Sequence, residues 1–336
     1  MDSITQAALG ATVAGVSAGK RTSKKVLLWG ALAGTLPDLD IIHSFFTDDV
    51  GRLVSHRGVT HSFILVPFAA YLFSRLFVRI APRTALSAQQ WFWLFFWCFT
   101  THIILDLLTV YGTQIFYPLS RYPYALASLF IIDPFYTFPL IGGLAYFALS
   151  KTPVIHRRHV LISIAALTSL YIVMAMVFKT YANHRFEAAL DQQKIDYQQI
   201  ETLNSPFNIL LWRAVVITED ASLNAWYSIL SPNKPIVFNQ TVAYSEREKL
   251  NTFATPGSDL AKLIRFSKGF YRYEEDTEGV KWIDLRFVAG GMYPFRYLVA
   301  VRNDEGELQP LTTVTQVKIK RRAPIKVIFE ELYENI

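Results

Sequence analysis

The chain has 336 residues and a formal net charge of +6 at pH 7, and 52% of its residues are hydrophobic. Its mean hydropathy of +0.25 is unusual for a soluble protein of this size, which argues against a wholly soluble chain. The hydrophobic excess ends at about residue 180. We therefore divide the sequence into a transmembrane helical domain, residues 1–180, and a soluble domain, residues 181–336.

Six apolar segments lie in the first domain, over residues 4–19, 26–46, 61–81, 91–112, 129–149 and 160–178. The last four approach the roughly 20 residues that a helix needs to span a bilayer. The first two are shorter or interrupted, and their Ala and Gly residues let helices approach closely in lipid. We expect a membrane α-helical bundle of about four full spans plus two short N-terminal hydrophobic helices.

Basic residues are unevenly distributed among the short loops that join these segments. One set of loops contains Lys20, Arg21, Lys24, Lys25, Arg79, Arg83, Lys151, Arg157 and Arg158. The other set contains only Arg52, Arg57 and Arg121. Because basic loops stay in the cytoplasm, we expect a multi-pass protein of the bacterial inner membrane with an extracytoplasmic C-terminal domain.

Ionisable residues lie within or beside the apolar segments, and the loop charges place all of them near the outer face. They come from four motifs: Asp38 and Asp40 in "PDLD", His56 and His61 in "HRGVTH", His102 and Asp106 in "HIILD", and Asp133 in "IDP". Such residues are energetically costly in a membrane and therefore indicate function. The four-residue spacing in "HIILD" puts both side chains on one helix face, where they can share a metal ion.

Each motif alone also has a structural interpretation. "HIILD" is then a buried hydrogen-bonded pair, "PDLD" a turn at a helix boundary, and "HRGVTH" a loop capped by Thr60. Their meeting at one face favours a metal site, and imidazole with carboxylate suits zinc, manganese or iron. Seven candidates exceed the four ligands of one tetrahedral ion. Either two ions bind, or some of the seven residues orient the ligands.

The motifs "LPDLD", "HRGVTHS", "HIILDLLTVYGT", "PLS" and "IDP" occur in this order in the first domain. Together they resemble a bacterial family described as LexA-binding, inner-membrane-associated metal-dependent hydrolases. The resemblance covers about residues 1–180 and implies metal ligands at Asp38, Asp40, His56, His61, His102 and Asp106. LexA binding is not carried over, because an outer-face site cannot meet a cytoplasmic repressor and no segment resembles a DNA-binding module.

In such a hydrolase, metal-activated water attacks a phosphoester or similar bond. We expect zinc or manganese as the metal, as one or two ions. Asp133 or Asp40 is the expected general base, and Arg57 is expected to stabilise developing negative charge. The depth of the site in the bilayer indicates a lipid-related substrate at the extracytoplasmic membrane interface.

Two alternatives compete with the hydrolase. A non-catalytic protein would bind or sense metal through the same cluster, and its outer domain would bind a partner. A transporter would use the cluster as an ion path, but polar residues should then cross the full membrane depth. A metal site filled entirely by protein ligands favours the first alternative, whereas an open coordination position favours the hydrolase.

The second domain alternates polar and apolar residues in short stretches, as strands do. Examples are "LLWRAVVITED", "IVFNQTVAY" and "FRYLVAVRN", separated by turn signals such as "SPNKP" and "NDEGE". "GSDLAKLIRFSKG" predicts a short helix with Ser258 or Asp259 at its N-cap. We expect a soluble α+β domain, mostly antiparallel sheet. The single cysteine, Cys98, lies in an apolar segment and is expected to be a packing residue.

Overall fold

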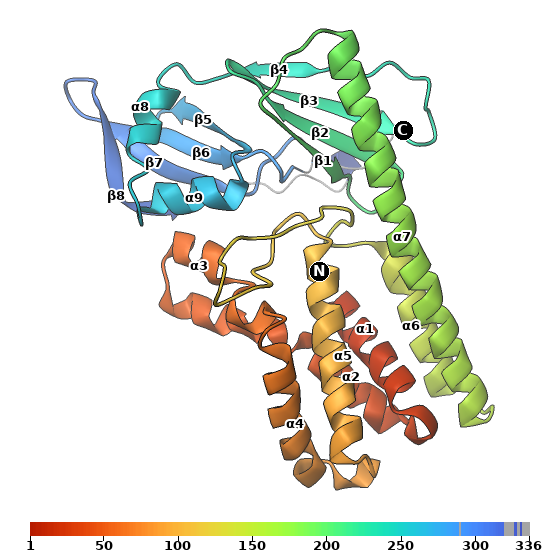
Figure 1. Cartoon of the computed structure of the whole chain (residues 1–336). Coiled ribbons are helices and arrows are strands. Elements are labelled where there is room, and N and C mark those ends of the chain that lie inside the picture. Colours follow the sequence, from red (N-terminus) through yellow and green to blue (C-terminus); the bar gives the residue numbers. More distant parts are fainter. Residues whose placement is uncertain (289, 319–325, 328–329, 331–336) are drawn as a thin grey trace. The chain divides into compact units, whose positions relative to one another are not determined.

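The computed structural model describes residues 1–288, 290–318, 326–327 and 330 (Figure 1). It contains two compact units. The helical unit comprises Met1–Ile42 and His56–Met176, and the sheet unit comprises His43–Ser55 and Val177–Ile336. The boundary within the long last helix falls close to the change in composition that the sequence shows at about residue 180.

The helical unit is built from six α-helices joined by short 3₁₀ turns. The helices are α1 (Ser3–Ser17), α2 (Lys24–Thr35), α4 (Val66–Ile80), α5 (Ala88–Leu107), α6 (Pro134–Leu149) and the first part of α7 (Val154–Gln192). The 3₁₀ elements are η1 (Gly19–Arg21), η2 (Pro37–Phe46), η3 (Val59–His61) and η4 (Pro82–Thr84). Polar N-caps start α1, α2, α5 and α6: Ser87, for example, forms a capping box with Gln90 at the start of α5.

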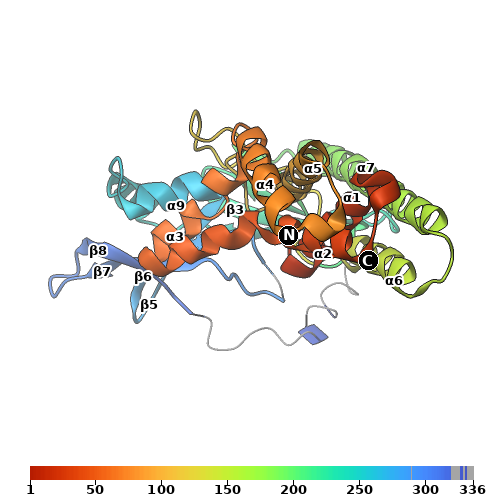
Figure 2. The same ribbon diagram turned by 90° about the horizontal axis from the view of Figure 1, so that it is seen from below.

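Helix α5 contacts α1, α2 and α4, and α1 also contacts α2 and α6 (Figures 1 and 2). Aromatic side chains fill the space between α4 and α5, where the rings of Phe77 and Phe95 have centroids 4.8 Å apart. Trp91 and Cys98 are buried in the same core. Cys98 is thus the packing residue that the sequence predicts.

Glycines let α1 and α2 pack almost backbone to backbone. A methyl group on Gly10 would lie 2.3 Å from the carbonyl oxygen of Gly30, and one on Gly34 would lie 2.4 Å from that of Gln6. Real side chains never approach so closely, so both positions require glycine. This close approach is the one that the Ala and Gly content of the first two segments predicts.

The expectation of four full spans is wrong. Among the described residues, one helix, α7, is long and apolar enough to cross a membrane. The count rises to three if each of two bent pairs is one span: Lys24–Thr35 with Pro37–His43, and Asp49–His61 with Val66–Ile80. The apolar runs at residues 61–81 and 129–149 become helical only from Val66 and Pro134, which leaves 15 and 16 residues. The 20-residue α5 contains glutamines, threonines, His102 and Asp106, which lower its hydropathy.

Helix α7 is 39 residues long and crosses the change in composition at about residue 180. It begins before the apolar run at residues 160–178 and continues through the polar stretch that follows it. Its C-terminal part belongs to the sheet unit, where Lys179 forms an ion pair with Glu201 at 2.9 Å. In the same part of the helix, Asn183 accepts a hydrogen bond from Thr202 at 2.7 Å.

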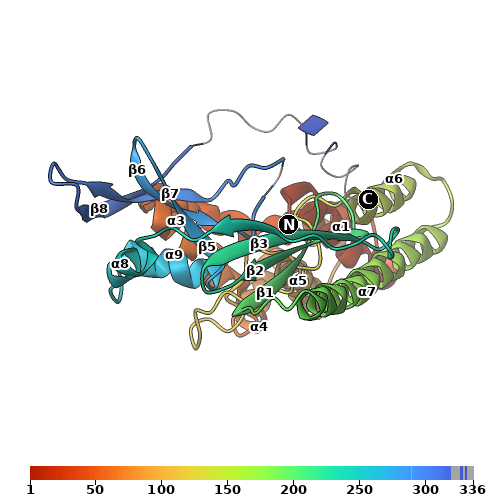
Figure 3. The same ribbon diagram turned by 90° about the horizontal axis from the view of Figure 1, so that it is seen from above.

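The sheet unit contains two four-stranded antiparallel sheets, each a simple meander (Figures 1 and 3). The first is formed by β1 (Gln199–Asn204), β2 (Leu211–Ile217), β3 (Ala221–Ser228) and β4 (Asn239–Val242). The second is formed by β5 (Tyr271–Asp276), β6 (Gly279–Asp284), β7 (Arg296–Arg302) and β8 (Leu308–Gln316). Three helices accompany them: α3 (Asp49–Ser55), α8 (Arg247–Thr252) and α9 (Asp259–Ser267). The expected antiparallel sheet structure is confirmed, and Ser258 caps α9.

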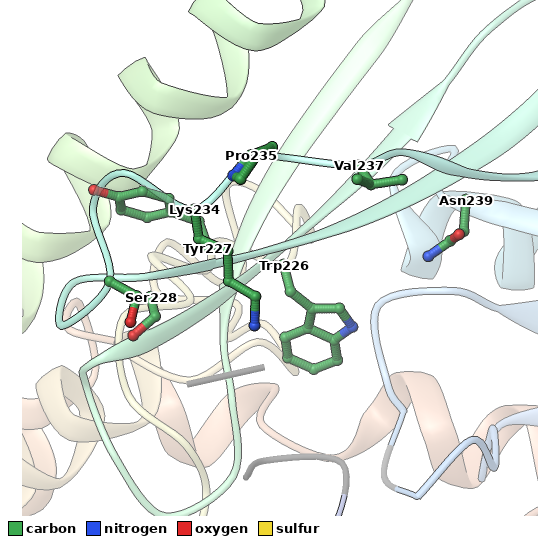
Figure 4. Close-up of a pocket in the computed structure, with 8 residues that line it drawn as sticks. Trp226, Tyr227, Ser228, Lys234, Pro235, Val237 and Asn239 are labelled. Carbon is green, nitrogen blue, oxygen red and sulfur yellow. The ribbon is translucent and has the colours of Figure 1, made fainter. Parts of the chain in front are cut away.

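Strand β2 is buried along its whole length. Its Arg213 donates hydrogen bonds to the carbonyl oxygens of Leu285 and Arg286, at 2.6 and 3.1 Å, and so ties the first sheet to the chain that follows β6. Beside β3 lies a hollow of about 310 Å³, lined by Trp226, Ser228, Lys234 and Asn239 among others (Figure 4). The hollow combines an aromatic ring with an ammonium group and a hydroxyl group.

We predict that Gly34→Ala lowers the stability of the helical unit by about 1–3 kcal/mol, because the added methyl group overpacks the contact between α1 and α2. Gly142→Ala in α6 is the matched control, since a methyl group there meets nothing within 4 Å. This control should be neutral or stabilising by about 0.5–1 kcal/mol. The midpoint of thermal aggregation in detergent measures both. Equal midpoints for the two variants would contradict a close backbone contact between α1 and α2 at Gly34.

Candidate metal centre

Four ionisable side chains meet inside the helical unit: Asp38, His61, His102 and Asp106. Asp38 comes from η2, His61 from the end of η3, and the other two from α5. One potential ligand atom from each residue lies within 4.8 Å of the corresponding atoms of the other three. We refer to these four residues as the metal group.

Local sequence explains how each residue reaches the group. Pro37 follows the end of α2 and starts η2, whose three-residue turns direct Asp38 and Asp40 to different sides. Gly58 and Arg57 shape the turn before η3, and Arg57 adopts a φ of 62°. On α5, His102 and Asp106 are one turn apart on the same face, as the "HIILD" spacing predicts.

The spacing of the ligand atoms matches a tetrahedral ion. His61 Nε2 lies 3.1 Å from His102 Nε2 and 3.2 Å from Asp106 Oδ2. Asp38 Oδ1 lies 3.5 Å from His61 Nε2 and 3.4 Å from His102 Nε2, and the pair His102 Nε2 and Asp106 Oδ2 is 3.6 Å apart. Metal–ligand bonds of about 2.0–2.2 Å place the corners of a tetrahedron about 3.3–3.6 Å apart. Three of these five distances lie in that range, and the other two are 0.1–0.2 Å shorter, so the spacing is close to that around one small divalent ion.

The hydrogen bonds of the two Nδ1 atoms determine which nitrogen of each imidazole carries the proton. His102 Nδ1 lies 2.7 Å from the carbonyl oxygen of Gly34, which can only accept a hydrogen bond. His61 Nδ1 lies 2.9 Å from Thr60 Oγ1, and that hydroxyl donates to Asp40. Both Nδ1 atoms are therefore donors, so the two Nε2 atoms present lone pairs to each other at 3.1 Å. Such a pair needs a cation or a shared proton between them.

Asp106 is the most enclosed member of the group. Its Oδ1 accepts a hydrogen bond from Gln6 Nε2 at 3.1 Å and contacts the α-amino group of Met1. Its Oδ2 lies 3.0 Å from Arg57 Nε, but within the described part of the chain it makes no hydrogen bond. A buried carboxylate oxygen without a hydrogen bond is costly. Together with the ligand spacing, it fits a carboxylate prepared to bind a metal.

Asp40 and His56 lie beside the metal group rather than in it. Asp40 Oδ1 is 2.8 Å from His56 Nδ1, and its Oδ2 accepts from the backbone N–H of Arg57 at 2.8 Å and from Thr60 at 3.1 Å. Asp40 Oδ2 is also 3.4 Å from His61 Nδ1. This carboxylate therefore orients a metal-facing imidazole, as carboxylates behind histidine ligands commonly do.

Arg57 and Asp133 do not lie where their expected catalytic roles would require them. Arg57 is buried, and its guanidinium group pairs with Asp106 and donates to Thr109 Oγ1 at 2.7 Å. Asp133 lies outside the metal group; it caps the N-terminus of α6 and accepts hydrogen bonds from the hydroxyl of Tyr171 at 2.9 and 3.1 Å.

Sequence reasoning missed three contributors to the site. Gln6 and the carbonyl of Gly34 come from the first two apolar segments, and the amino group of Met1 precedes them. Gln6 was detectable as an amide within a run of small apolar residues. The Gly34 carbonyl gives no signal in the sequence, because every residue has one.

Comparison with known proteins supports the membrane setting of this centre. A family profile described as the YdjM inner membrane protein matches residues 1–183, which include the whole metal group. The chain belongs to the YdjM inner membrane protein family. Membership agrees with the inner-membrane association that the motifs imply. The family description mentions neither LexA binding nor hydrolysis.

One relative aligns with most of the chain, and its description names no activity. An uncharacterised protein of Bacillus subtilis (strain 168), YfhP, is 25% identical over 283 residues, which cover 81% of this chain and 81% of YfhP. The similarity therefore extends past the matched family region into the sheet unit. No solved structure matches the chain significantly.

We predict that Asp40→Asn weakens metal binding by about 10–100-fold, the usual effect of losing a carboxylate that orients a histidine ligand. The amide keeps the shape of the side chain but removes its charge. Asp191→Asn, at an exposed position near the end of α7, is the matched control and should bind metal like the wild type. Competition with a chromophoric chelator measures the affinity. An unchanged affinity in Asp40→Asn would show that this carboxylate does not support His61.

Proposed function

We propose that this protein is a metal-dependent hydrolase of the inner membrane, with one divalent ion held by Asp38, His61, His102 and Asp106. The observation that supports a bound ion best is the near-tetrahedral spacing of these four ligand atoms inside an apolar helical unit. Two imidazoles and two carboxylates suit zinc, manganese or iron, and we propose zinc or manganese. An ion bound there would act as a Lewis acid that activates water and polarises a phosphoester.

The surrounding residues position the ligands in this proposal. Arg57 and Gln6 hold Asp106, and Asp40 holds His61. Arg57 is therefore assigned to orientation of the site rather than to direct stabilisation of the substrate. Asp133 would take part in the chemistry only after a rearrangement, because Tyr171 and the N-terminus of α6 occupy its oxygens.

The closure of the ligand set favours a second candidate, a non-catalytic metal-binding or metal-sensing protein. Four protein ligands fill every position of a tetrahedral ion, which is typical of structural sites. The hydrolase requires either a fifth coordination position or the release of one ligand. Asp38 is the ligand best placed to release, because 21% of its side chain is exposed whereas the other three are fully buried.

The orientation in the membrane is also part of the proposal. The basic loops favour a multi-pass arrangement in which the metal group and the sheet unit face the extracytoplasmic side. Segments of α2 and η2 would then form one bent span that ends at the metal group. Apart from Arg57, the loop charges that motivate this arrangement belong to residues outside the site.

We predict that the protein, purified in detergent, carries about one transition-metal ion per chain, as expected for one tetrahedral site. The double variant His102→Ala, Asp106→Ala should lose it. Mass spectrometry of bound metals, with the protein amount measured on the same sample, gives the stoichiometry. A wild type that holds no metal, even after zinc or manganese is supplied, would end both the hydrolase and the metal-sensing proposals.

We predict that Co²⁺ substituted into the wild type gives the weak visible absorption of a five- or six-coordinate ion, because the hydrolase needs a position for water. Strong bands from a four-coordinate ion, unchanged when phosphate is added, would favour the metal-sensing candidate. Hydrolysis of a phosphodiester by the Zn²⁺ or Mn²⁺ form is measured on the same preparation. Chelation should abolish that hydrolysis, and readdition of the metal should restore it.

A further inference from the structure

Only one residue of the metal group, Asp38, has a side chain that is partly exposed to the surface. The side chains of His61, His102 and Asp106 have no exposed area, whereas that of Asp38 is 21% exposed. Among the described members of the site, Asp38 therefore marks the entrance through which a substrate would approach. The chemistry of its neighbours determines what kind of molecule that entrance admits.

The residues that follow Asp38 on η2 are large, apolar and exposed. Ile41 is 57% exposed and Leu39 is 51% exposed, and Ile42 is similar. In a 3₁₀ helix, residues three apart lie on the same side. Ile41 therefore continues the side of η2 on which Asp38 lies. The entrance is polar at the metal group and aliphatic along the next turn.

The polar side chains near this entrance are already engaged with one another. Thr60 and His56 both hydrogen bond to Asp40. The guanidinium group of Arg57 is buried against Asp106 and Thr109. A bound metal ion would therefore be the cationic group that meets an incoming anion, and the surface beyond it offers apolar contact.

The entrance lies on a candidate membrane span. Helix α2 and the first residues of η2, Pro37–His43, together pass as one broken span with a bend of 46°. Aliphatic side chains exposed on such a span face lipid, where their exposure costs nothing; in water each would cost about 1.5–3 kcal/mol relative to burial. A molecule that reaches Asp38 along this surface has to partition into the bilayer.

We infer that the substrate is a membrane lipid with a phosphodiester head group, which approaches from within the bilayer with that head group at Asp38 and an acyl chain along Ile41. The inference rests on the proposed hydrolase and names its substrate class. Hydrolysis of such a phosphodiester consumes one water: its oxygen joins phosphorus, the phosphorus–oxygen bond to the leaving alcohol breaks, and that alcohol takes up a proton.

The test compares two phosphodiesters that share a head group and differ in their chains. The full chain in dodecyl maltoside is loaded with one equivalent of Mn²⁺, and binding is confirmed by mass spectrometry. Transverse relaxation of ³¹P is then measured for dihexanoylphosphatidylglycerol and for glycerophosphoglycerol, which has no acyl chains. Because Mn²⁺ relaxes phosphorus only at short range, the enhancement reports head groups that reach the metal group. We expect roughly tenfold more enhancement for the lipid, from apolar contact with its chain.

Two variants locate the effect. Ile41→Ser should lower the lipid enhancement by roughly tenfold, the loss expected for one large aliphatic contact, and should leave Mn²⁺ binding unchanged. Leu72→Ser on α4 removes a similar side chain that is 68% exposed, and it should change neither. A fall in lipid enhancement of the same size in both variants would overturn the assignment of the chain to η2.

The remaining outcomes separate this inference from the proposed function. Equal enhancement for the two phosphodiesters would overturn the lipid inference and leave a hydrolase of soluble phosphoesters. Bound Mn²⁺ with no enhancement for either would exclude phosphodiesters at the metal group, and the lipid inference with them. Failure to bind either Mn²⁺ or Zn²⁺ would remove the metal centre, and both proposals would fall together.

Discussion

The helical unit depends on the compensation of one buried carboxylate. Asp106 has no exposed side-chain area and lies in a bundle whose surroundings are largely aliphatic and aromatic. An unpaired charge in such a place is prohibitive. Arg57 and Gln6 reach it from different segments, and His61 and His102 lie within 3.6 Å of its outer oxygen. The folds of the N-terminal helix, the "HRGVTH" turn and α5 are therefore coupled through this carboxylate.

Close packing of α1 against α2 makes this arrangement reachable. Gly10 and Gly34 allow the two backbones to touch, which brings Gln6 to Asp106 and the Gly34 carbonyl to His102. A larger residue at Gly34 would push away the carbonyl that holds the imidazole. The small residues of the first two segments thus serve packing and ligand orientation at once. A change there is expected to affect metal affinity even though neither glycine is a ligand.

Residue spacing predicted the part of the site that one regular helix fixes. The four-residue interval between His102 and Asp106 predicts that both side chains lie on one face of a helix, and in α5 they do. The interval in "HRGVTH" carries no such rule, because the chain passes through an irregular turn at Gly58 before η3, and only His61 joins the metal group. Hydropathy located the apolar runs but could not locate the helix starts. The segment at residues 61–81, for example, becomes α-helical only at Val66.

The break between α2 and η2 explains both the placement of Asp38 and Asp40 and the partial exposure of Asp38. Pro37 cannot donate the hydrogen bond that would continue α2, and the chain passes into turns of three residues. Within three consecutive positions, Asp38 faces the metal group, Leu39 is exposed, and Asp40 turns toward His56 and His61. A regular α-helix would spread these positions differently, and the ligand and its orienting neighbour could not serve the same imidazole. The same break leaves Asp38 as the one partly exposed ligand, so the irregularity that completes the metal group also provides its access.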